Sequence, residues 1–168
     1  VVTEKNIVFS TRKIKYSKED YKNGFKLKLS SVLRNPTSMM TYLKALSYNE
    51  NLYEYNKANK EGFNEVVFLN IYGNIAEGAT SNIFIIKDKK IYTPKISDGI
   101  LPGVVRNWVI KNFRVCEKHL DKEDLYSADE VFITNSILGI MKIVQFEERS
   151  YSTSMVERIR SEYEQFII

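Results

Sequence analysis

Short apolar runs of strand length recur along the chain, separated by turn residues and by a few helix-length segments. Residues 25–29 alternate apolar and basic side chains, and residues 65–70, 82–86 and 131–134 are mostly apolar. Alternation predicts a half-buried strand, whereas an apolar run bounded by turn residues predicts a buried one. This strand content exceeds that of a doubly wound fold of similar size, so the sequence predicts a mixed α/β or α+β domain.

The remaining segments fit the same prediction. Further strands are expected over residues 6–10, 75–77, 91–93, 114–117 and 140–146, and the runs over 82–86 and 91–93 should form a hairpin. Helices are expected after an N-cap at Ser17 and over residues 41–60, 104–113, 121–126 and 154–166. The helix over 41–60 is the longest of these, with an apolar stripe at roughly helical spacing.

Composition limits the classes of function. A chain of 168 residues with 43% hydrophobic residues is long enough for one domain with its own core. Its 25 Lys and Arg residues outnumber 21 Asp and Glu residues but are scattered, which favours anionic small molecules over nucleic acid. Cys116 and His119 are the single cysteine and the single histidine, which argues against a zinc site, a Cys/His catalytic pair and an internal disulfide. We expect a cytoplasmic protein with no membrane span and no secretory leader.

Lys44 stands among apolar residues in the expected helix over 41–60. A lysine in such surroundings usually extends its ammonium group along the apolar surface to solvent. The alternative is a partly desolvated lysine with a lowered pKa, whose neutral amine attacks a carbonyl carbon. The pattern alone favours the first interpretation.

Glu77 follows an apolar strand and precedes the small residues Gly78 and Ala79. Its simplest interpretation is an acid in a turn. The functional alternative is an anionic partner for a buried cation, with the small residues leaving room for a flat ligand.

Two other segments could bind an anion. Residues 101–106 lead from a Pro-Gly loop into a helix, where the first backbone N–H groups are free to donate. Asn135 and Ser136 end a strand and could add donors, although a helix entry and a strand-ending turn are the ordinary interpretations. Together with Lys44 and Glu77, these donors make up the three parts of a pyridoxal 5′-phosphate site: a reactive lysine, a carboxylate for a ring nitrogen and a phosphate cradle.

Four segments, taken in order, resemble the class IV, fold-type IV pyridoxal-phosphate enzymes. They are residues 44–49 (KALSYN), 74–84 (NIAEGATSNIF), 100–106 (ILPGVVR) and 128–136 (ADEVFITNS). The family includes branched-chain and D-amino-acid aminotransferases and aminodeoxychorismate lyase, and the match runs from about Phe25 to Val144. The resemblance implies the large-domain pseudo-barrel of the D-amino-acid aminotransferase-like enzymes as the fold.

The resemblance also implies a role for each matching residue. Lys44 falls on the Schiff-base lysine, which also moves the proton and is the catalytic residue. Glu77 falls on the acid that pairs with the pyridinium nitrogen, and Leu101 on the residue that lies against the ring.

The implied phosphate contacts come from two segments. The backbone N–H groups of Val104 and Val105 fall on the family's two main-chain donors. Ser136 falls on a hydroxyl that binds the phosphate, with Asn135 beside it. The resemblance implies no metal ligands.

Within the family, residues 135–139 and the segment 34–36 look more like the lyase than the aminotransferases. The implied reaction converts 4-amino-4-deoxychorismate into 4-aminobenzoate and pyruvate, a step of folate biosynthesis. The alternative is an aminotransferase for branched-chain or D-amino acids, and a third is a domain without catalysis. Lys142 and Ile143 depart from the Pro-Val pair usual in the family, away from the implied cofactor contacts.

The family also has a smaller N-terminal domain that supplies an arginine to the phosphate. Residues 1–16 resemble only the last strand of that domain and the linker, and residues 17–168 resemble the large pyridoxal-phosphate-binding domain. We therefore expect this chain by itself to bind the cofactor weakly or not at all and to be inactive, and we expect the full-length protein to be an enzyme. We also expect it to associate, because family members are usually homodimers.

Overall fold

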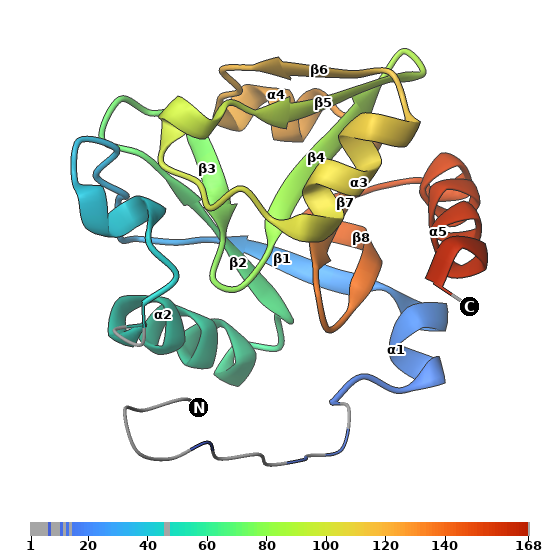
Figure 1. The fold of residues 1–168 in the computed structure, drawn as a ribbon, viewed down its shortest axis with the longest axis horizontal. Helices are drawn as coiled ribbons and strands as arrows, with labels where there is room; N and C mark the ends of the chain where they lie inside the picture. Colours follow the sequence, from blue (N-terminus) through green and yellow to red (C-terminus); the bar gives the residue numbers. More distant parts are fainter. Residues whose placement is uncertain (1–6, 8–10, 12, 14, 46–47, 168) are drawn as a thin grey trace.

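The computed structural model describes residues 7, 11, 13, 15–45 and 48–167. The expected strand over residues 6–10 lies outside this range, apart from Ile7. A curled sheet forms the centre of the fold, and the helices lie around it (Figure 1).

The described residues contribute nine strands to this sheet. The strands are β1 (Phe25–Leu29), β2 (Glu65–Leu69), β3 (Ile75–Gly78), β4 (Asn82–Lys87), β5 (Lys90–Pro94), β6 (Val115–Lys118), β7 (Glu130–Asn135), β8 (Gly139–Phe146) and β9 (Arg149–Ser150). Their order is β3-β2-β1-β8-β7-β4-β5-β6, with β9 paired to β8. The pairs β1/β2, β1/β8 and β5/β6 are parallel, and the others are antiparallel. This mixture confirms the predicted α/β class and the curled-sheet fold.

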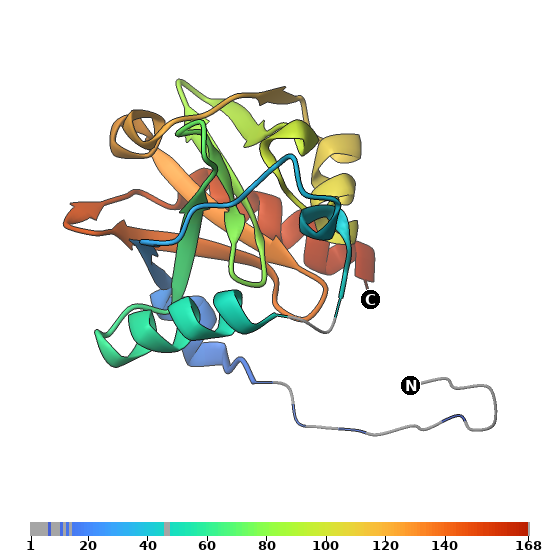
Figure 2. The same ribbon diagram turned by 90° about the vertical axis from the view of Figure 1, so that its left-hand side faces the viewer.

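The helices are short or of medium length. They are α1 (Lys18–Asn23), α2 (Asn49–Lys60), α3 (Val104–Asn112), α4 (Lys122–Ser127) and α5 (Ser154–Ile167), with 3-10 turns η1 (Met39–Tyr42) and η2 (Ile96–Asp98). Helices α3 and α5 lie on one flank of the sheet, and α2 lies on another (Figures 1 and 2). Along the part of the chain that the structure describes, none of the helices is long and apolar enough to cross a membrane.

Alternation along the central strands builds two cores. Ile83 and Ile85 of β4 pack in a core on one face of the sheet, together with side chains from β1, β7, β8 and α4. Phe84 and Ile86 pack on the other face against α3 and α5. The Phe84 ring stacks on the Phe132 ring of β7, with centroids 4.6 Å apart. The two-residue period of the sequence therefore sets which side chains meet α3, whose first turn is part of the candidate site.

Most predicted elements are confirmed. The helix expected after Ser17 is α1. A capping box stabilises its N-terminal end, because Ser17 and Asp20 each accept a hydrogen bond from the other's backbone N–H. The hairpin is β4–β5, and the terminal amphipathic helix is α5, with Val156 and Ile159 buried.

The predicted helix over residues 41–60 is wrong in its first part. The chain forms the 3-10 turn η1, residues 43–45 and 48 are not helical, and α2 begins only at Asn49. The hydroxyl of Thr41 donates to the carbonyl of Asn35, and the hydroxyl of Tyr42 donates to the carbonyl of Pro36. These bonds hold η1 against the preceding loop, so contacts outside the helix override its periodicity. Lys44 consequently lies in an irregular segment and not on the inner face of a helix.

Candidate active site

Glu77 lies on β3 and is buried, with 7% of the residue exposed. The backbone N–H of Leu101 donates to its Oε2 at 2.9 Å, and the side-chain amide of Asn82 lies 3.4 Å from the same oxygen. Burial raises the pKa of Glu77 to about 7, and the hydrogen bond from Leu101 and the charges of Arg34 and Lys44 act in the opposite direction. Glu77 is thus a buried carboxylate that gains from a cationic ligand.

Arg34 supplies the positive charge nearest to this carboxylate. Its Nη2 lies 3.5 Å from Oε1 of Glu77, and its Cζ lies 4.5 Å above the centre of the Phe68 ring. No hydrogen-bond partner for Nε or Nη2 is found among the described residues. Arg34 therefore acts mainly through its charge, and it favours the ionised form of Glu77.

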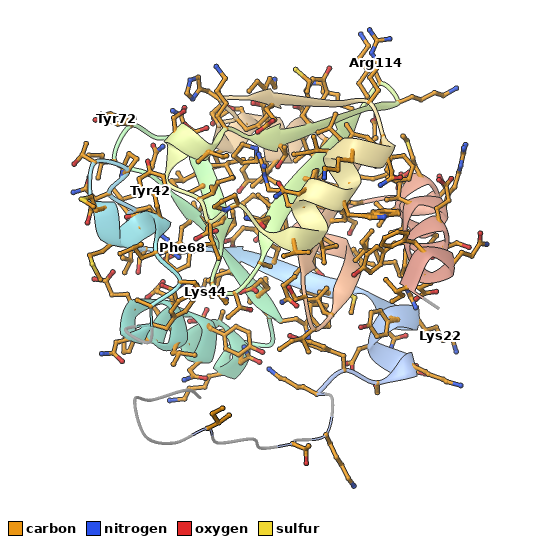
Figure 3. All side chains as sticks on the ribbon, viewed as in Figure 1. Lys22, Tyr42, Lys44, Phe68, Tyr72 and Arg114 are labelled. Carbon is orange, nitrogen blue, oxygen red and sulfur yellow. The ribbon has the colours of Figure 1, made fainter. Side chains whose placement is uncertain are left out.

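Lys44 lies in the connection between η1 and α2, and its side chain is exposed. Figure 3 labels it between α2 and Phe68 in that view. Its Nζ is 5.9 Å from the centre of the Tyr48 ring, and its charge reaches Glu77 and lowers the pKa of that carboxyl. The structure thus brings Lys44 and Glu77 to one region, although not through the helix that the sequence predicted.

Tyr48 is a candidate site residue to which sequence reasoning gave no role. It is half-buried, and burial, followed by the charge of Glu77, raises the pKa of its hydroxyl. The signal was present, since Tyr48 belongs to the segment over 44–49 that carries the resemblance. Its nearness to Glu77 and Lys44 becomes visible only in three dimensions.

The loop from Leu101 to Gly103 connects Glu77 to the start of α3. The Leu101 carbonyl accepts a hydrogen bond of 2.7 Å from the side-chain amide of Asn82. A Cβ added at Gly103 would lie 2.2 Å from Oδ1 of Asn82, so only glycine fits here without a shift. Asn82 therefore fixes this loop relative to Glu77, a role for which the sequence offered no signal beyond the motif.

The first turn of α3 is open for an anion. Its N-cap, Gly103, has no side chain to satisfy the first backbone N–H groups. The side chain of Val104 is 75% exposed, whereas Val105 is buried against the sheet. Backbone N–H groups at a helix start attract anions, which fits the predicted phosphate contacts of Val104 and Val105.

The turn after β7 presents Ser136, whose side chain is exposed. Oδ1 of Asn135 accepts hydrogen bonds of 2.8 Å from the N–H groups of both Ile137 and Leu138. Nδ2 of Asn135 donates to the carbonyl of Thr80 at 3.2 Å. In the structure Asn135 thus shapes the turn that carries Ser136, and its direct contact with a phosphate stays a prediction.

Strand pairing brings the two candidate anion-binding segments to one end of the sheet. Asn82 at the start of β4 pairs with Thr134 near the end of β7, one residue before Asn135. Asn82 also touches the segment that begins α3. Ser136 and the first turn of α3 therefore extend from neighbouring points, and Glu77 lies beside them.

These residues fit pyridoxal 5′-phosphate. The site offers a carboxylate for a ring nitrogen, an amine that can react with an aldehyde, and N–H and hydroxyl donors for a phosphate. No Cβ at Gly78 or Gly103 obstructs the close approach of neighbouring groups. No group of three or more potential metal ligands occurs among the residues that the structure describes.

A curled mixed sheet with a lysine, a buried acid and a helix start at one end is typical of the fold-type IV class of pyridoxal-phosphate proteins. The chain belongs to the amino-transferase class IV family, whose sequence model matches residues 2–146.

Curated relatives carry two different names. The chain is 31% identical over 155 residues to "Probable branched-chain-amino-acid aminotransferase" of Aquifex aeolicus, covering 88% of this chain and 50% of the relative. It is 35% identical over 135 residues to "Aminodeoxychorismate lyase" of Bacillus subtilis, covering 77% and 46%. The chain thus spans about half the length of the curated relatives it matches.

Solved structures similar to this chain carry the same two kinds of name. A putative 4-amino-4-deoxychorismate lyase of Legionella pneumophila superposes with a TM-score of 0.81 at 27% identity, covering 84% of this chain and 56% of that one. A branched-chain aminotransferase of Thermobaculum terrenum, solved in its PLP form, gives 0.81 at 26% identity, covering 88% and 53%. These matches confirm the predicted family and fold, and they support pyridoxal 5′-phosphate as the cofactor.

Proposed function

We propose that this chain is the large cofactor-binding domain of a pyridoxal-phosphate lyase that converts 4-amino-4-deoxychorismate into 4-aminobenzoate and pyruvate. The observation that carries the choice is the turn after β7, where Asn135 and Ser136 are followed by Ile137 and Leu138. Aminotransferases of the family prefer a Gly/Ser-Thr pair followed by an acid, whereas the lyases resemble the present turn. The Arg34-Asn35-Pro36 segment and the Bacillus subtilis relative point the same way.

Lys44 is the proposed catalytic residue. Its exposed amine is free to react with an aldehyde carbon and, once released by the substrate amine, to remove the proton at C4 of the substrate ring. The cofactor, when bound, supplies an electron sink for the charge left by that proton. The bond between C3 and the enolpyruvyl oxygen then breaks, the released enolpyruvate takes up a proton to give pyruvate, and the ring is left aromatic. General acid–base help of this kind contributes about 10²–10⁴-fold.

Glu77 is proposed to hold a proton at the ring nitrogen of the cofactor. A protonated ring nitrogen adds to the counter-charge that this buried carboxylate obtains from Arg34, at 3.5 Å, and from Lys44. Leu101 closes the same region, since its N–H donates to Glu77 and its carbonyl accepts from Asn82.

The phosphate is proposed to sit between the first turn of α3 and the turn after β7. Val104 and Val105 offer backbone N–H groups, and Ser136 offers its hydroxyl. Asn135 orients the turn through its bonds to Ile137 and Leu138. These contacts bind and orient the cofactor and take no part in proton transfer.

An absorbance titration with pyridoxal phosphate tests the cofactor and the lysine together. We expect a long-wavelength band that is absent in Lys44→Ala and that shifts when substrate is added. Formation of 4-aminobenzoate and pyruvate in equal amounts from 4-amino-4-deoxychorismate would support the lyase. A band that persists in Lys44→Ala would refute the role of Lys44.

The second candidate is an aminotransferase for branched-chain or D-amino acids, and the identity to the Aquifex aeolicus relative favours it. It predicts that an amino acid alone converts the bound cofactor to its amine form and releases a keto acid. The lyase predicts no such half-reaction. Incubation with valine and with D-alanine, followed by absorbance, separates the two.

A further inference from the structure

A second buried carboxylate lies close to the candidate site, and nothing in the proposed chemistry uses it. Glu65 begins β2, directly before the apolar run over residues 66–69, and only 2% of it is exposed. A buried carboxylate needs hydrogen-bond donors around it, and the nature of those donors indicates its role.

The donors to Glu65 come mostly from the tip of the turn that connects β3 to β4, residues 78–81. The Ala79 N–H donates at 3.1 Å, the Ser81 hydroxyl at 3.0 Å and the Thr80 hydroxyl at 3.4 Å. The N–H of Val66, next to Glu65 in the chain, donates at 3.0 Å. One side chain on β2 thus contacts three consecutive residues of the tip.

The strand pairing explains why the tip needs this side chain. The β2–β3 ladder places Val67 opposite Gly78 and goes no further, because the chain turns at the tip. Polar groups just beyond the last pair lose their ladder partners, and the carboxylate of Glu65 supplies acceptors in their place. Gly78 leaves room for this arrangement, since a Cβ there would lie 2.3 Å from Oγ of Ser81 and 3.3 Å from Cδ of Glu65.

The tip of the β3–β4 turn connects the parts of the candidate site. Glu77 directly precedes it and Asn82 directly follows it, and both contact Leu101. The tip also meets α2 through a 2.6 Å bond from Asn51 to the Ala79 carbonyl. It meets the Ser136 turn through the bond from Asn135 to the Thr80 carbonyl. A displaced tip would therefore move the carboxylate of Glu77.

We infer that Glu65 is a positioning residue that acts through Glu77, by holding the tip of the β3–β4 turn where the Glu77 carboxylate meets the ring nitrogen of the cofactor. This inference rests on the proposed cofactor site. It assigns Glu65 no contact with cofactor or substrate.

The test compares two ligands that differ only at the ring nitrogen. They are pyridoxal 5′-phosphate and its deaza analogue, in which a C–H group replaces that nitrogen. The ratio of their dissociation constants, measured by absorbance or fluorescence titration of the full chain, reports the contact with Glu77. A hydrogen bond to a charged group predicts a ratio of about tenfold or more in favour of pyridoxal phosphate.

We expect Glu65→Ala to reduce this ratio to within about threefold of unity, because the carboxylate of Glu77 is no longer aligned, and we expect the same of Glu77→Gln. Glu65→Gln should retain most of the ratio. Its amide oxygen can still accept from the N–H groups of Ala79 and Val66, and its NH₂ can donate to the hydroxyl of Ser81.

Glu130→Ala is the matched control. The carboxylate of Glu130 is also buried and also accepts from two backbone N–H groups and a serine hydroxyl, but these belong to the start of α5. This variant loses similar hydrogen bonds and should leave the ligand ratio unchanged. If Glu65→Ala does not fold, Ser81→Ala removes one hydrogen bond to Glu65 and should lower the ratio in part.

An unchanged ratio in every folded variant of Glu65 and Ser81 would overturn the inference, because a merely structural role weakens both ligands equally. A reduced ratio in Glu130→Ala as well would also overturn it. Failure of the proposed function gives another result: the unaltered chain then shows no preference for pyridoxal phosphate over the deaza analogue, and Glu77→Gln changes nothing.

Discussion

Glu77 is the residue at which burial and charge conflict most in the candidate site. Its pKa rises from an ordinary value of 4.5 to about 7, mainly through burial. A raised carboxyl pKa means that the folded chain binds the proton more tightly than the unfolded chain does. The free energy of unfolding therefore falls as pH rises from about 4.5 to about 7. At 1.36 kcal/mol per pH unit the loss is on the order of 3 kcal/mol.

Glu77→Gln should remove this loss. We expect the variant to match the unaltered chain near pH 5, where Glu77 is protonated, and to be more stable near pH 8. Urea unfolding at several pH values measures the difference. Burial raises the pKa of Glu65 too, so the stability of the variant should still fall as pH rises. Parallel stability curves for the two proteins would contradict the assignment.

Gly103 is a second residue of the candidate site at which a small change should have a large effect. A Cβ there would lie 2.2 Å from Oδ1 of Asn82, so Gly103→Ala must displace either Asn82 or the start of α3. Overpacking of this kind costs about 1–3 kcal/mol, and we expect about tenfold weaker binding of pyridoxal phosphate. Val104→Ala is the control, because it trims an exposed side chain and keeps the N–H group. Equal losses in both variants would argue against the steric explanation.

At the scale of elements, one buried acid caps the start of α5. Glu130 at the start of β7 accepts hydrogen bonds from the N–H groups of Met155 and Val156 and from the hydroxyl of Ser154. These groups form the start of α5, where backbone donors lack partners in the helix. We expect Glu130→Ala to lower the free energy of unfolding by about 2–4 kcal/mol and Ser154→Ala by about 1 kcal/mol. Urea unfolding checks both, and similar effects of the two changes would contradict this account.

The elements that the sequence predicted well are those decided by burial over a short window. Phe84 and Ile86 alternate with Ile83 and Ile85, and this period places them on opposite faces of β4. The helix predicted from residue 41 failed in part because its apolar stripe does not face the core. Leu52 is exposed, whereas Asn51 and Glu54 of α2 are buried. Tyr48, the N-cap of α2, makes no side-chain capping bond, so nothing in the local sequence marks the beginning of that helix.

From the sequence, only those parts of the candidate site that lie within one motif could be predicted. Lys44, Glu77 and the start of α3 could each be named as candidates from the sequence, whereas the contact between Arg34 and Glu77 could not. Arg34 lies 43 positions before Glu77, and the two meet only because β1 and β3 flank β2. Contacts of this range depend on strand order, which composition and periodicity do not determine.

At the scale of the whole molecule, the candidate site is open to solvent on one side. Lys44, Val104 and Ser136 are all exposed, although each is proposed to contact the cofactor or its phosphate. The chain spans about half the length of its matched relatives. The resemblance implies that a smaller domain preceding this one supplies a further arginine to the phosphate.

We therefore expect the chain by itself to bind pyridoxal phosphate at least about tenfold more weakly than a protein in which such a domain precedes it. One charge-assisted hydrogen bond to the phosphate accounts for a difference of that size. Titration of both proteins gives the ratio. Pyridoxal without the phosphate is the control, because it should bind the two proteins with a much smaller difference. Equal affinities for pyridoxal phosphate would mean that the groups on this chain complete the phosphate site alone.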